Sequence, residues 1–322
     1  MDFFALFKTI SFAMLEIFIL AAFGFILVRK KIISDDGIRL LSKLLVEFIL
    51  PLFIFTKVIK SFSFSLYPNW WIFPIISIMI NLAGFSVGFA WFSLVKQAKT
   101  KLQKRQLVSL VGFQNSGYLP LILVATLLSS VVAETMFIYI FLFLLGFNLL
   151  IWSFGVWFLS GHSVKRFEFA SVFSPPVVAI AVSLIVVALG IDKLIPQFLF
   201  HPAKMLGDCL LPLSMIVVGA NLAEVSVKNI NRSAITNAVI LKLILLPILA
   251  LAVLWWLRPE YLIGLLIILQ AAVPSATTLS LITRHYRLED EFVSHGIFFT
   301  HLVCVFTIPA WLVVYQIFAF FK

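Results

Sequence analysis

The sequence predicts an all-α polytopic membrane protein that crosses the bilayer ten times, and three observations lead to this fold class. First, 62% of the 322 residues are hydrophobic, 12% are charged and the mean hydropathy is +1.13. A soluble domain cannot bury that much apolar surface. Second, the charges are clustered, so that long uncharged stretches lie between them. Third, a segment in the first half of the chain reappears at the matching place in the second half.

The first half contains five mainly apolar stretches, each close to the roughly 20 residues that one helical crossing needs. The first stretch ends at a basic turn, Arg29 to Lys31, and the third ends before a strongly basic loop that begins at Lys96. The predicted crossings in this half are residues 7–28, 37–59, 71–95, 106–128 and 135–159.

A short linker over residues 161–174 leads to the second half, which again contains five apolar stretches. The predicted crossings there are residues 175–189, 202–223, 233–257, 261–286 and 292–320. Most Lys and Arg residues fall in the loops that follow odd-numbered crossings. Because cytoplasmic loops carry the positive excess, both termini are expected outside, in a multi-pass protein of the cell (inner) membrane.

The same distribution argues against nucleic acid as a partner, although the net charge is +10. The basic residues sit in short loops between apolar stretches and form no continuous binding face. The two cysteines, Cys209 and Cys304, lie far apart in apolar stretches, so no disulfide framework or metal-ligand spacing is present. No nucleotide-binding loop occurs either. We therefore expect no cofactor and no metal.

An internal repeat relates the two halves. Residues 43–52 (KLLVEFILPL) match residues 204–213 (KMLGDCLLPL), with Lys43 opposite Lys204 and Glu47 opposite Asp208. The offset is half of the chain length. Since each half holds an odd number of crossings, the second copy must enter the membrane upside down. This predicts an inverted repeat of five plus five crossings, with residues 1–161 as the first unit and residues 162–322 as the second.

The fourth and ninth predicted crossings each contain a proline within a polar sequence. The first of these sequences runs from Gln114 to Pro120 and the second from Gln270 to Ser275, with Pro274 inside it. Proline removes a backbone hydrogen bond and clashes with the preceding turn, so each helix should break there. In lipid, a break is tolerated only where protein or a water-filled cavity satisfies the freed groups. Matched broken helices in two halves indicate a transporter binding site.

The broken helices also predict which residues bind a substrate. The half-helix after each break presents unpaired N–H groups and the positive end of its dipole, which favour an anion. Pro120 and Pro274 suit the first turn of such a half-helix, Gly117 lets the backbone turn and Tyr118 could stack on a flat substrate. Side-chain hydrogen bonds are expected from Asn115, Ser116, Gln270, Ser275 and Thr277. The alternative is a pair of ordinary proline kinks.

Four charged residues inside predicted crossings form a second candidate group, because buried charge in a membrane is expensive and usually functional. They are Glu16, Glu47, Asp208 and Lys242. Lys43 and Glu47 are four residues apart, as are Lys204 and Asp208, so each pair can form a local ion pair that neutralises itself. Lys242 has no such helical partner and must pair across helices, snorkel or serve an anionic substrate. A coupling ion, H⁺ or Na⁺, remains open. His301 is either a proton relay or a structural histidine.

At these residues the chain resembles the auxin efflux carrier family, which includes plant PIN-type carriers and bacterial permeases of the malonate-carrier type. The similar stretches are Asn115 to Pro120, Leu211 to Leu213 with Gly219 to Leu222, and Ala272 to Thr277 with the following Arg284-His285-Tyr286. The acidic turn Glu289 to Glu291, Phe299-Thr300 and Thr307 to Pro309 continue the same order. The resemblance extends over essentially the whole chain.

The resemblance implies a scaffold made of crossings one, two, six and seven and a transport unit made of crossings three to five and eight to ten. It also implies an elevator-type motion and an organic anion held where crossings four and nine meet, with Asn115 as the carboxylate-binding candidate. A homodimer through the scaffold helices is an open expectation. The chain departs from the plant carriers in its short central linker, which puts auxin itself in doubt. His301 stands where a small or apolar residue is expected.

The leading hypothesis is thus a secondary transporter, and no enzyme, that carries small organic anions, chiefly carboxylates. The fold is also similar to that of bile acid–sodium symporters, so the alternative is a sodium-coupled symporter of amphipathic anions. An intramembrane aspartyl protease is disfavoured, because Met205 stands where the Gly-x-Gly-Asp motif around Asp208 needs a glycine. A channel or sensor is a further hypothesis.

Overall fold

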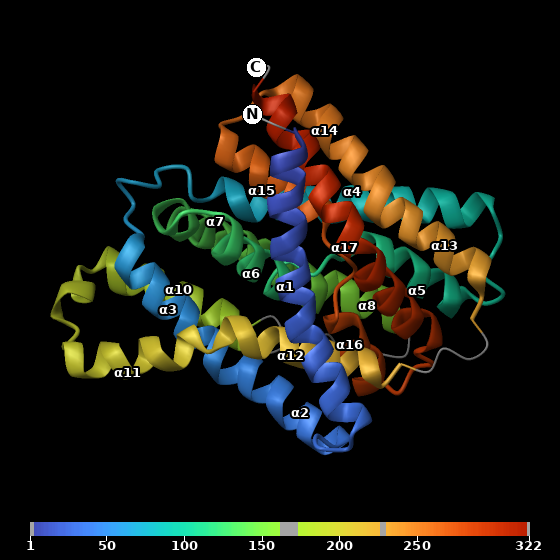
Figure 1. Cartoon of the computed structure of the whole chain (residues 1–322), viewed down its shortest axis with the longest axis horizontal. Helices are drawn as coiled ribbons and strands as arrows, with labels where there is room; N and C mark the ends of the chain where they lie inside the picture. The colour runs from blue at the N-terminus through green and yellow to red at the C-terminus, as the bar shows by residue number, and fades with distance from the viewer. Residues whose placement is uncertain (1–2, 162–172, 226–229, 321–322) are drawn as a thin grey trace.

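The computed structural model describes residues 3–161, 173–225 and 230–320, and its elements there are helices without a strand. The predicted linker over residues 161–174, and with it the boundary between the two predicted repeat units, lies largely outside the described residues. Figure 1 shows long helices that cross one another at various tilts around the middle of the molecule.

The first half begins with one long helix and continues through interrupted ones. Its elements are α1 (Phe3–Arg29), α2 (Asp35–Leu44), η1 (Leu45–Ile49), α3 (Leu50–Ser61), α4 (Ile72–Leu94), α5 (Lys101–Gly112), α6 (Tyr118–Leu127), α7 (Ser130–Leu150), η2 (Ile151–Gly155) and α8 (Val156–Ser160). The π-helical turns η1 and η2 connect consecutive α-helices without a change of chain direction, so α2 to α3 and α7 to α8 are each one continuous rod. The second predicted crossing is therefore helical from Asp35 to Ser61.

The second half has the same character. Its elements are α10 (Pro175–Ala188), the 3₁₀ turn η4 (Ile191–Leu194), α11 (Gln197–Asp208), α12 (Leu210–Ala223), α13 (Arg232–Ile240), the π-helical turn η5 (Leu241–Leu245), α14 (Leu246–Leu257), α15 (Tyr261–Ala272), α16 (Thr278–His285) and α17 (Glu291–Phe320). The seventh predicted crossing was placed too late, because α11 begins at Gln197 and Pro202 lies inside it.

Six helical stretches among the described residues are long and apolar enough to span a membrane: Phe7–Arg29, Ile72–Leu94, Ser130–Ser160, Gln197–Ala223, Arg232–Leu257 and Phe292–Ala319. Tyr118–Leu127, Pro175–Ala188 and Tyr261–Ala272 are shorter apolar helices. Two of the shorter ones are halves of the predicted broken crossings, α6 and α15. The protein is thus an all-helical, multi-pass membrane protein, while the count of ten crossings stays a prediction.

Close helix packing holds α1 against α12, which cross in Figure 1. A Cβ atom on Gly219 of α12 would lie 1.7 Å from the backbone oxygen of Ala21, and one on Gly24 of α1 would lie 1.9 Å from that of Ile216. The absence of a side chain at these glycines lets the two backbones touch, which is the usual way for helices to associate tightly in lipid.

Ion pairs connect helices that are far apart in the sequence. Lys57 of α3 binds Glu134 of α7 at 2.6 Å, and the hydroxyl of Ser61 also donates to Glu134 at 3.1 Å. Arg284 of α16 binds Glu224, which follows α12, at 2.9 Å. Both pairs link an element of the predicted scaffold to one of the predicted transport unit.

Candidate functional site

The first predicted helix break is present between α5 and α6. Helix α5 ends at Gly112, Phe113 is extended, and α6 starts at Tyr118 with Pro120 in its first turn. Phe113 is fully buried. Its ring packs edge-on against Phe85, with the ring centroids 4.8 Å apart, and against Phe147, with the centroids 6.0 Å apart. This aromatic contact anchors the non-helical segment inside the protein, where it needs no contact with lipid.

The second break lies between α15 and α16. Helix α15 ends at Ala272, Val273 is extended, and Thr277 directly precedes α16. Pro274 therefore lies in the extended segment, before α16 begins. The expectation that Pro274 sits in the first turn of a half-helix was wrong, because the segment stays extended until Thr277 in order to pair with the first break.

The two breaks meet as a short antiparallel bridge between Gln114 and Ser275. The backbone N–H of Asn115 donates to the carbonyl oxygen of Pro274 at 2.8 Å, and that of Ala276 donates to Phe113 at 3.0 Å. Main-chain groups freed by one broken helix are thus satisfied by the other. The two breaks therefore meet in one crossover, as the family resemblance implied for crossings four and nine.

Side chains from both halves reinforce the crossover. The amide of Gln270 donates to the carbonyl oxygen of Ser116 at 3.2 Å, and the hydroxyl of Ser275 donates to that of Leu110 at 2.6 Å. Gln270 and Ser275 are completely buried. These two predicted binding residues hold the crossover together and do not line the cavity described below.

Asn115 is held by His301 of α17. The side-chain nitrogen Nδ2 of Asn115 lies 3.2 Å from Nε2 of His301, while Nδ1 of His301 lies 2.8 Å from the carbonyl oxygen of Ile297. A carbonyl oxygen only accepts, so Nδ1 carries the proton and Nε2 accepts from Asn115. This leaves the second amide hydrogen and the oxygen of Asn115 for another partner. Between the two readings of His301, the geometry agrees with a structural histidine that orients Asn115.

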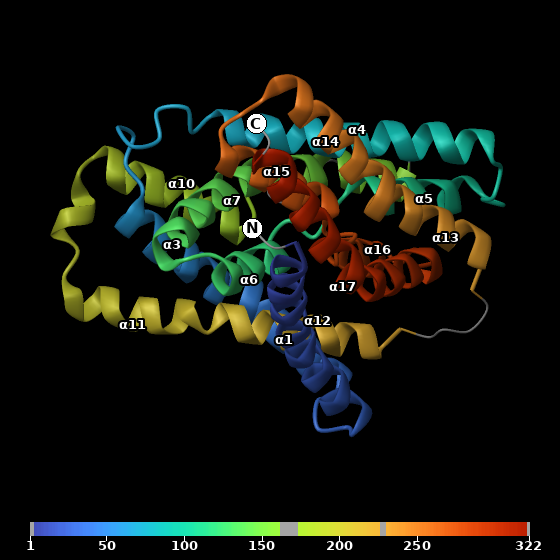
Figure 2. The ribbon, with the colours of Figure 1, turned by 45° about the horizontal axis from the view of Figure 1, so that its top comes forward.

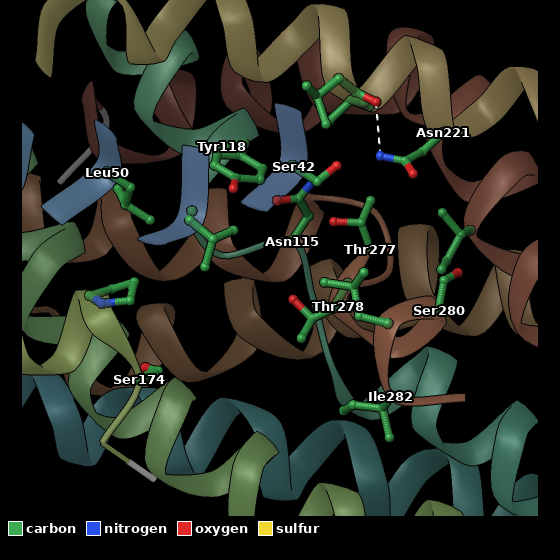
Figure 3. Close-up of a pocket in the computed structure, with 18 of the residues that line it drawn as sticks. Ser42, Leu50, Asn115, Tyr118, Ser174, Asn221, Thr277, Thr278, Ser280 and Ile282 are labelled. Carbon is green, nitrogen blue, oxygen red and sulfur yellow. Dashed lines mark hydrogen bonds between the residues drawn. The ribbon is translucent and has the colours of Figure 1, made fainter. Parts of the chain in front are cut away.

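A cavity of about 640 Å³ lies beside the crossover. Of the predicted binding and charged residues, Asn115, Ser116, Gly117, Tyr118, Thr277 and Glu47 line it. Pro120, Pro274, Gln270, Ser275, Glu16, Asp208 and Lys242 do not. Figure 3 shows Asn115 and Thr277 close to each other in the pocket, with Tyr118 and Ser42 beside them and Asn221 on the neighbouring helix. The cavity therefore lies between α2, η1 and α12 on one side and the crossover on the other.

The start of α6 and the start of α16 both line this cavity. The first N–H groups of a helix have no intrahelical partner, and they carry the positive end of the dipole. Gly117 itself has a negative φ of −102°, and a Cβ there would have its nearest neighbour at 4.0 Å. The backbone turn expected at Gly117 is present, because α6 begins at the next residue.

The charges around the cavity are mainly basic. Arg39, Lys43 and Arg284 line it, and Glu47 is the acidic residue among the described lining. Arg39 is paired with Asp36 at 3.0 Å and Arg284 with Glu224 at 2.9 Å. Lys43 and Glu47 form the expected local pair, with 3.8 Å between their charged atoms. Because these cations are paired with carboxylates, the two helix starts are the groups that can hold an anion here.

Several lining residues escaped the sequence reasoning. Asn148 of α7 and Asn221 of α12 line the cavity, as do Trp152 and Arg284. Each asparagine donates to its own helix, to Leu144 and Val217 respectively, which leaves the amide oxygen available. The usable signal in the sequence is a lone asparagine within an apolar stretch.

Lys242 lies in η5 and is fully buried, and its Nζ has no hydrogen-bond partner among the described residues. It neither snorkels nor forms an ion pair there, and it is not part of the cavity lining. Glu16 and Asp208 are exposed on the surface of the single chain. Asp208 binds Lys204 at 2.5 Å, the local pair that the four-residue spacing predicted.

Comparison with known proteins agrees with this architecture. The sequence matches the family described as membrane transport protein over residues 9–170 and 162–312. It is 28% identical to an uncharacterized transporter, C5D6.04, of Schizosaccharomyces pombe over 117 residues, which is 36% of this chain and 25% of that protein. It is 25% identical to Protein PIN-LIKES 1 of Arabidopsis thaliana over 164 residues, 46% of this chain and 34% of that protein. The matches thus cover about a quarter to a third of these relatives.

Proposed function

Because the chain belongs to the family of membrane transport proteins that includes the auxin efflux carriers, we propose that it is a secondary transporter of small organic anions, chiefly carboxylates. The observation that carries this proposal is the position of the crossover beside the cavity. Two half-helices begin at the cavity, and Asn115 lies between them with part of its amide free. A carboxylate fits such a site, since N–H groups and positive dipole ends bind anions.

We propose that the anion binds between Asn115 and Thr277, with Tyr118 against its apolar part. Trp152, Phe147 and Leu50 add apolar surface to the lining. This mixture suits a carboxylate that carries a small hydrophobic or aromatic group. The positive ends of the two helix starts favour the carboxylate end of such a molecule.

The transport cycle in this proposal is alternating access by an elevator-type motion within ten crossings. The scaffold consists of α1, α2 to α3, α10 and α11 to α12, and the remaining helices carry the crossover. The cavity lining extends from Asn115 to Arg39 and Ser174, next to the loops that the distribution of positive charge assigns to the cytoplasm. This supports an inward-facing state, with both termini outside the cell.

Uptake into proteoliposomes tests the proposal. Purified protein should catalyse saturable flux of some members of a panel containing malonate, other carboxylates and aromatic acids. The Asn115→Ala variant should lose that flux, whereas Asn237→Ala should keep it, because Asn237 binds Gln97 away from the cavity. Absence of flux for every member under sodium, proton and substrate gradients would contradict a carboxylate transporter.

The same assay separates the two forms of coupling. Replacement of sodium by choline at constant pH leaves the flux unchanged in a proton-coupled or uncoupled carrier, and abolishes it in a sodium symporter of amphipathic anions. A homodimer through the scaffold helices is a further part of the proposal, and the mass of the detergent-solubilised protein measures it.

A further inference from the structure

Two asparagines of the cavity lining have no role in the proposed function. Asn148 lies on α7 and Asn221 on α12, and both are half-buried. The Nδ2 of Asn148 donates to the carbonyl oxygen of Leu144 at 2.8 Å, and that of Asn221 donates to the carbonyl oxygen of Val217 at 2.9 Å. Because a carbonyl oxygen only accepts, the nitrogen of each amide must face it, which fixes how both amides are turned.

The amide oxygens of the two residues are open toward the cavity. Among the described residues, no group donates to Oδ1 of Asn148 or Asn221. Neither oxygen is one of the fully enclosed polar atoms in that part of the chain, and both residues line the cavity. A ligand or a water molecule in the cavity can therefore donate to each oxygen.

Fixed acceptors of this kind differ from the other polar groups of the lining. Ser42, Thr277 and Ser280 contribute hydroxyl groups (Figure 3), and a hydroxyl rotates so that it donates or accepts as the ligand requires. The peptide N–H groups at the two helix starts only donate. The amide oxygens only accept, so they select a ligand group that carries an O–H or N–H. The second hydrogen of each Nδ2 suits a hydroxyl as well, since a hydroxyl also accepts.

The two acceptors lie beyond the helix starts that favour the carboxylate. A side-chain atom of Leu144 would lie 4.0 Å from a Cβ atom on Gly117, at the start of α6. Asn148 follows Leu144 by one helical turn, about 5.4 Å along the axis of α7. Figure 3 shows Asn221 beside Thr277, which directly precedes α16. A molecule with its carboxylate at the helix starts can therefore reach the acceptors with its other end.

We propose that Asn148 and Asn221 select organic anions that carry a hydroxyl or N–H group at the end opposite the carboxylate. The distal O–H or N–H donates to one or both amide oxygens. The inference rests on the proposed transporter function, and it narrows the substrate class from small carboxylates to those with a distal donor. An analogue without the donor displaces water and leaves the oxygens without a partner, so it binds more weakly.

Matched pairs of ligands test the selection on the unmodified protein. The two members of the pair para-hydroxybenzoate and para-fluorobenzoate are similar in size, and only the first has a distal donor. The pair para-hydroxyphenylacetate and para-fluorophenylacetate is longer by one methylene group. Isothermal titration calorimetry of the detergent-solubilised protein gives each Kd. In at least one pair the hydroxy acid should bind about fivefold or more tightly than the fluoro acid, and equal Kd values within both pairs overturn the inference.

Leucine substitutions locate the selection. Asn148→Leu and Asn221→Leu keep the approximate size of the side chain and remove the acceptor, and each breaks a bond only to its own helix. The double variant should bind the preferred hydroxy acid about fivefold more weakly and the fluoro acid no more weakly than the parent does. Asn237→Leu is the matched control, because Asn237 binds Gln97 away from the cavity, and it should keep the parent preference. A double variant with the parent preference overturns the role of the two amides.

Neutral esters separate this inference from the proposed function. Acids that bind without preference within each pair leave the carboxylate transporter intact and remove the selection. If no acid binds, methyl para-hydroxybenzoate and methyl para-fluorobenzoate are compared. A preference for the hydroxy ester that the Asn148→Leu, Asn221→Leu double variant loses supports the selection and contradicts the carboxylate assignment. Equal binding of the two esters, or binding of neither, overturns the selection as well.

Discussion

The side-chain amide of Asn115 lies 3.2 Å from Nε2 of His301, and this contact joins the first broken helix to the last helix of the chain. His301 in turn is fixed by the carbonyl oxygen of Ile297 at 2.8 Å. The carbonyl group of Ile297 on α17 thus orients the ring of His301, and the ring orients the side-chain amide of Asn115 beside the cavity. A residue that does not line the cavity therefore controls the one that does.

His301→Leu should raise the KM for the transported anion about fivefold, since it removes one neutral hydrogen bond of roughly 1 kcal/mol from the residue that binds. His301→Gln keeps an acceptor within reach of Asn115 and should recover most of the affinity. Concentration-dependent uptake into proteoliposomes measures both. Equal KM values for His301→Leu and the parent protein would show that Asn115 is oriented without the ring.

Substitutions at Asn115 itself test the sign of the substrate charge. A saturating carboxylate, at about 100 times its Kd, should stabilise the parent protein by roughly 2.7 kcal/mol through mass action. Asn115→Ala should lose the resulting shift in Tm, and so should Asn115→Asp, which preserves size but repels an anion. If Asn115→Asp still responded to carboxylates as the parent does, the site would have to lie elsewhere.

Ser275→Ala should destabilise the crossover. The substitution leaves the buried carbonyl oxygen of Leu110 without its side-chain donor, and an unsatisfied buried group costs about 1–3 kcal/mol. Ser86→Ala is the matched control, because the hydroxyl of Ser86 binds its own exposed helix at Leu82 and its loss should cost little. Thermal unfolding in detergent compares the two, and a Tm loss of the same size in both variants would contradict the structural role of Ser275.

Gly219→Ala should damage the fold far more than Gly117→Ala. The added methyl group at Gly219 meets the backbone of Ala21 at 1.7 Å, and rigid backbone cannot give way, so α1 and α12 must separate. At Gly117 the nearest atom is 4.0 Å away. We expect Gly219→Ala to abolish or strongly reduce the yield of folded monodisperse protein in size-exclusion chromatography. Gly117→Ala should elute as the parent does, and the reverse order would be inconsistent with the packing described.

The sequence was sufficient for the helical class, for both helix breaks and for Asn115, Tyr118 and Thr277 in the lining. These follow from local rules: apolar length gives the spans, and proline gives the breaks. The sequence did not predict the conformation at Pro274, which was expected in the first turn of a helix and lies in an extended segment. The hydrogen bond from Asn115 to Pro274 overrides the preference of proline for a first helical turn. Nor could it separate Gln270 and Ser275, which tie the crossover together, from Asn115, which lines the cavity. That distinction depends on which way each side chain points across two distant segments.

The pairing of Asn115 with Pro274 is made by the main chain, and this affects how such a carrier can change its cargo. A side-chain replacement never removes the peptide carbonyl group, and it removes the peptide N–H only when it introduces proline. The main-chain pairing that presents the two helix starts therefore persists through most mutations. The surrounding side chains, among them Leu50, Tyr118 and Trp152, can be exchanged without dismantling that pairing. Binding of the negative group of a substrate thus depends on the main chain, whereas selection among substrates by their other groups depends on the side chains of the lining. Relatives built on this plan can diverge in what they carry through a few replacements in the lining alone.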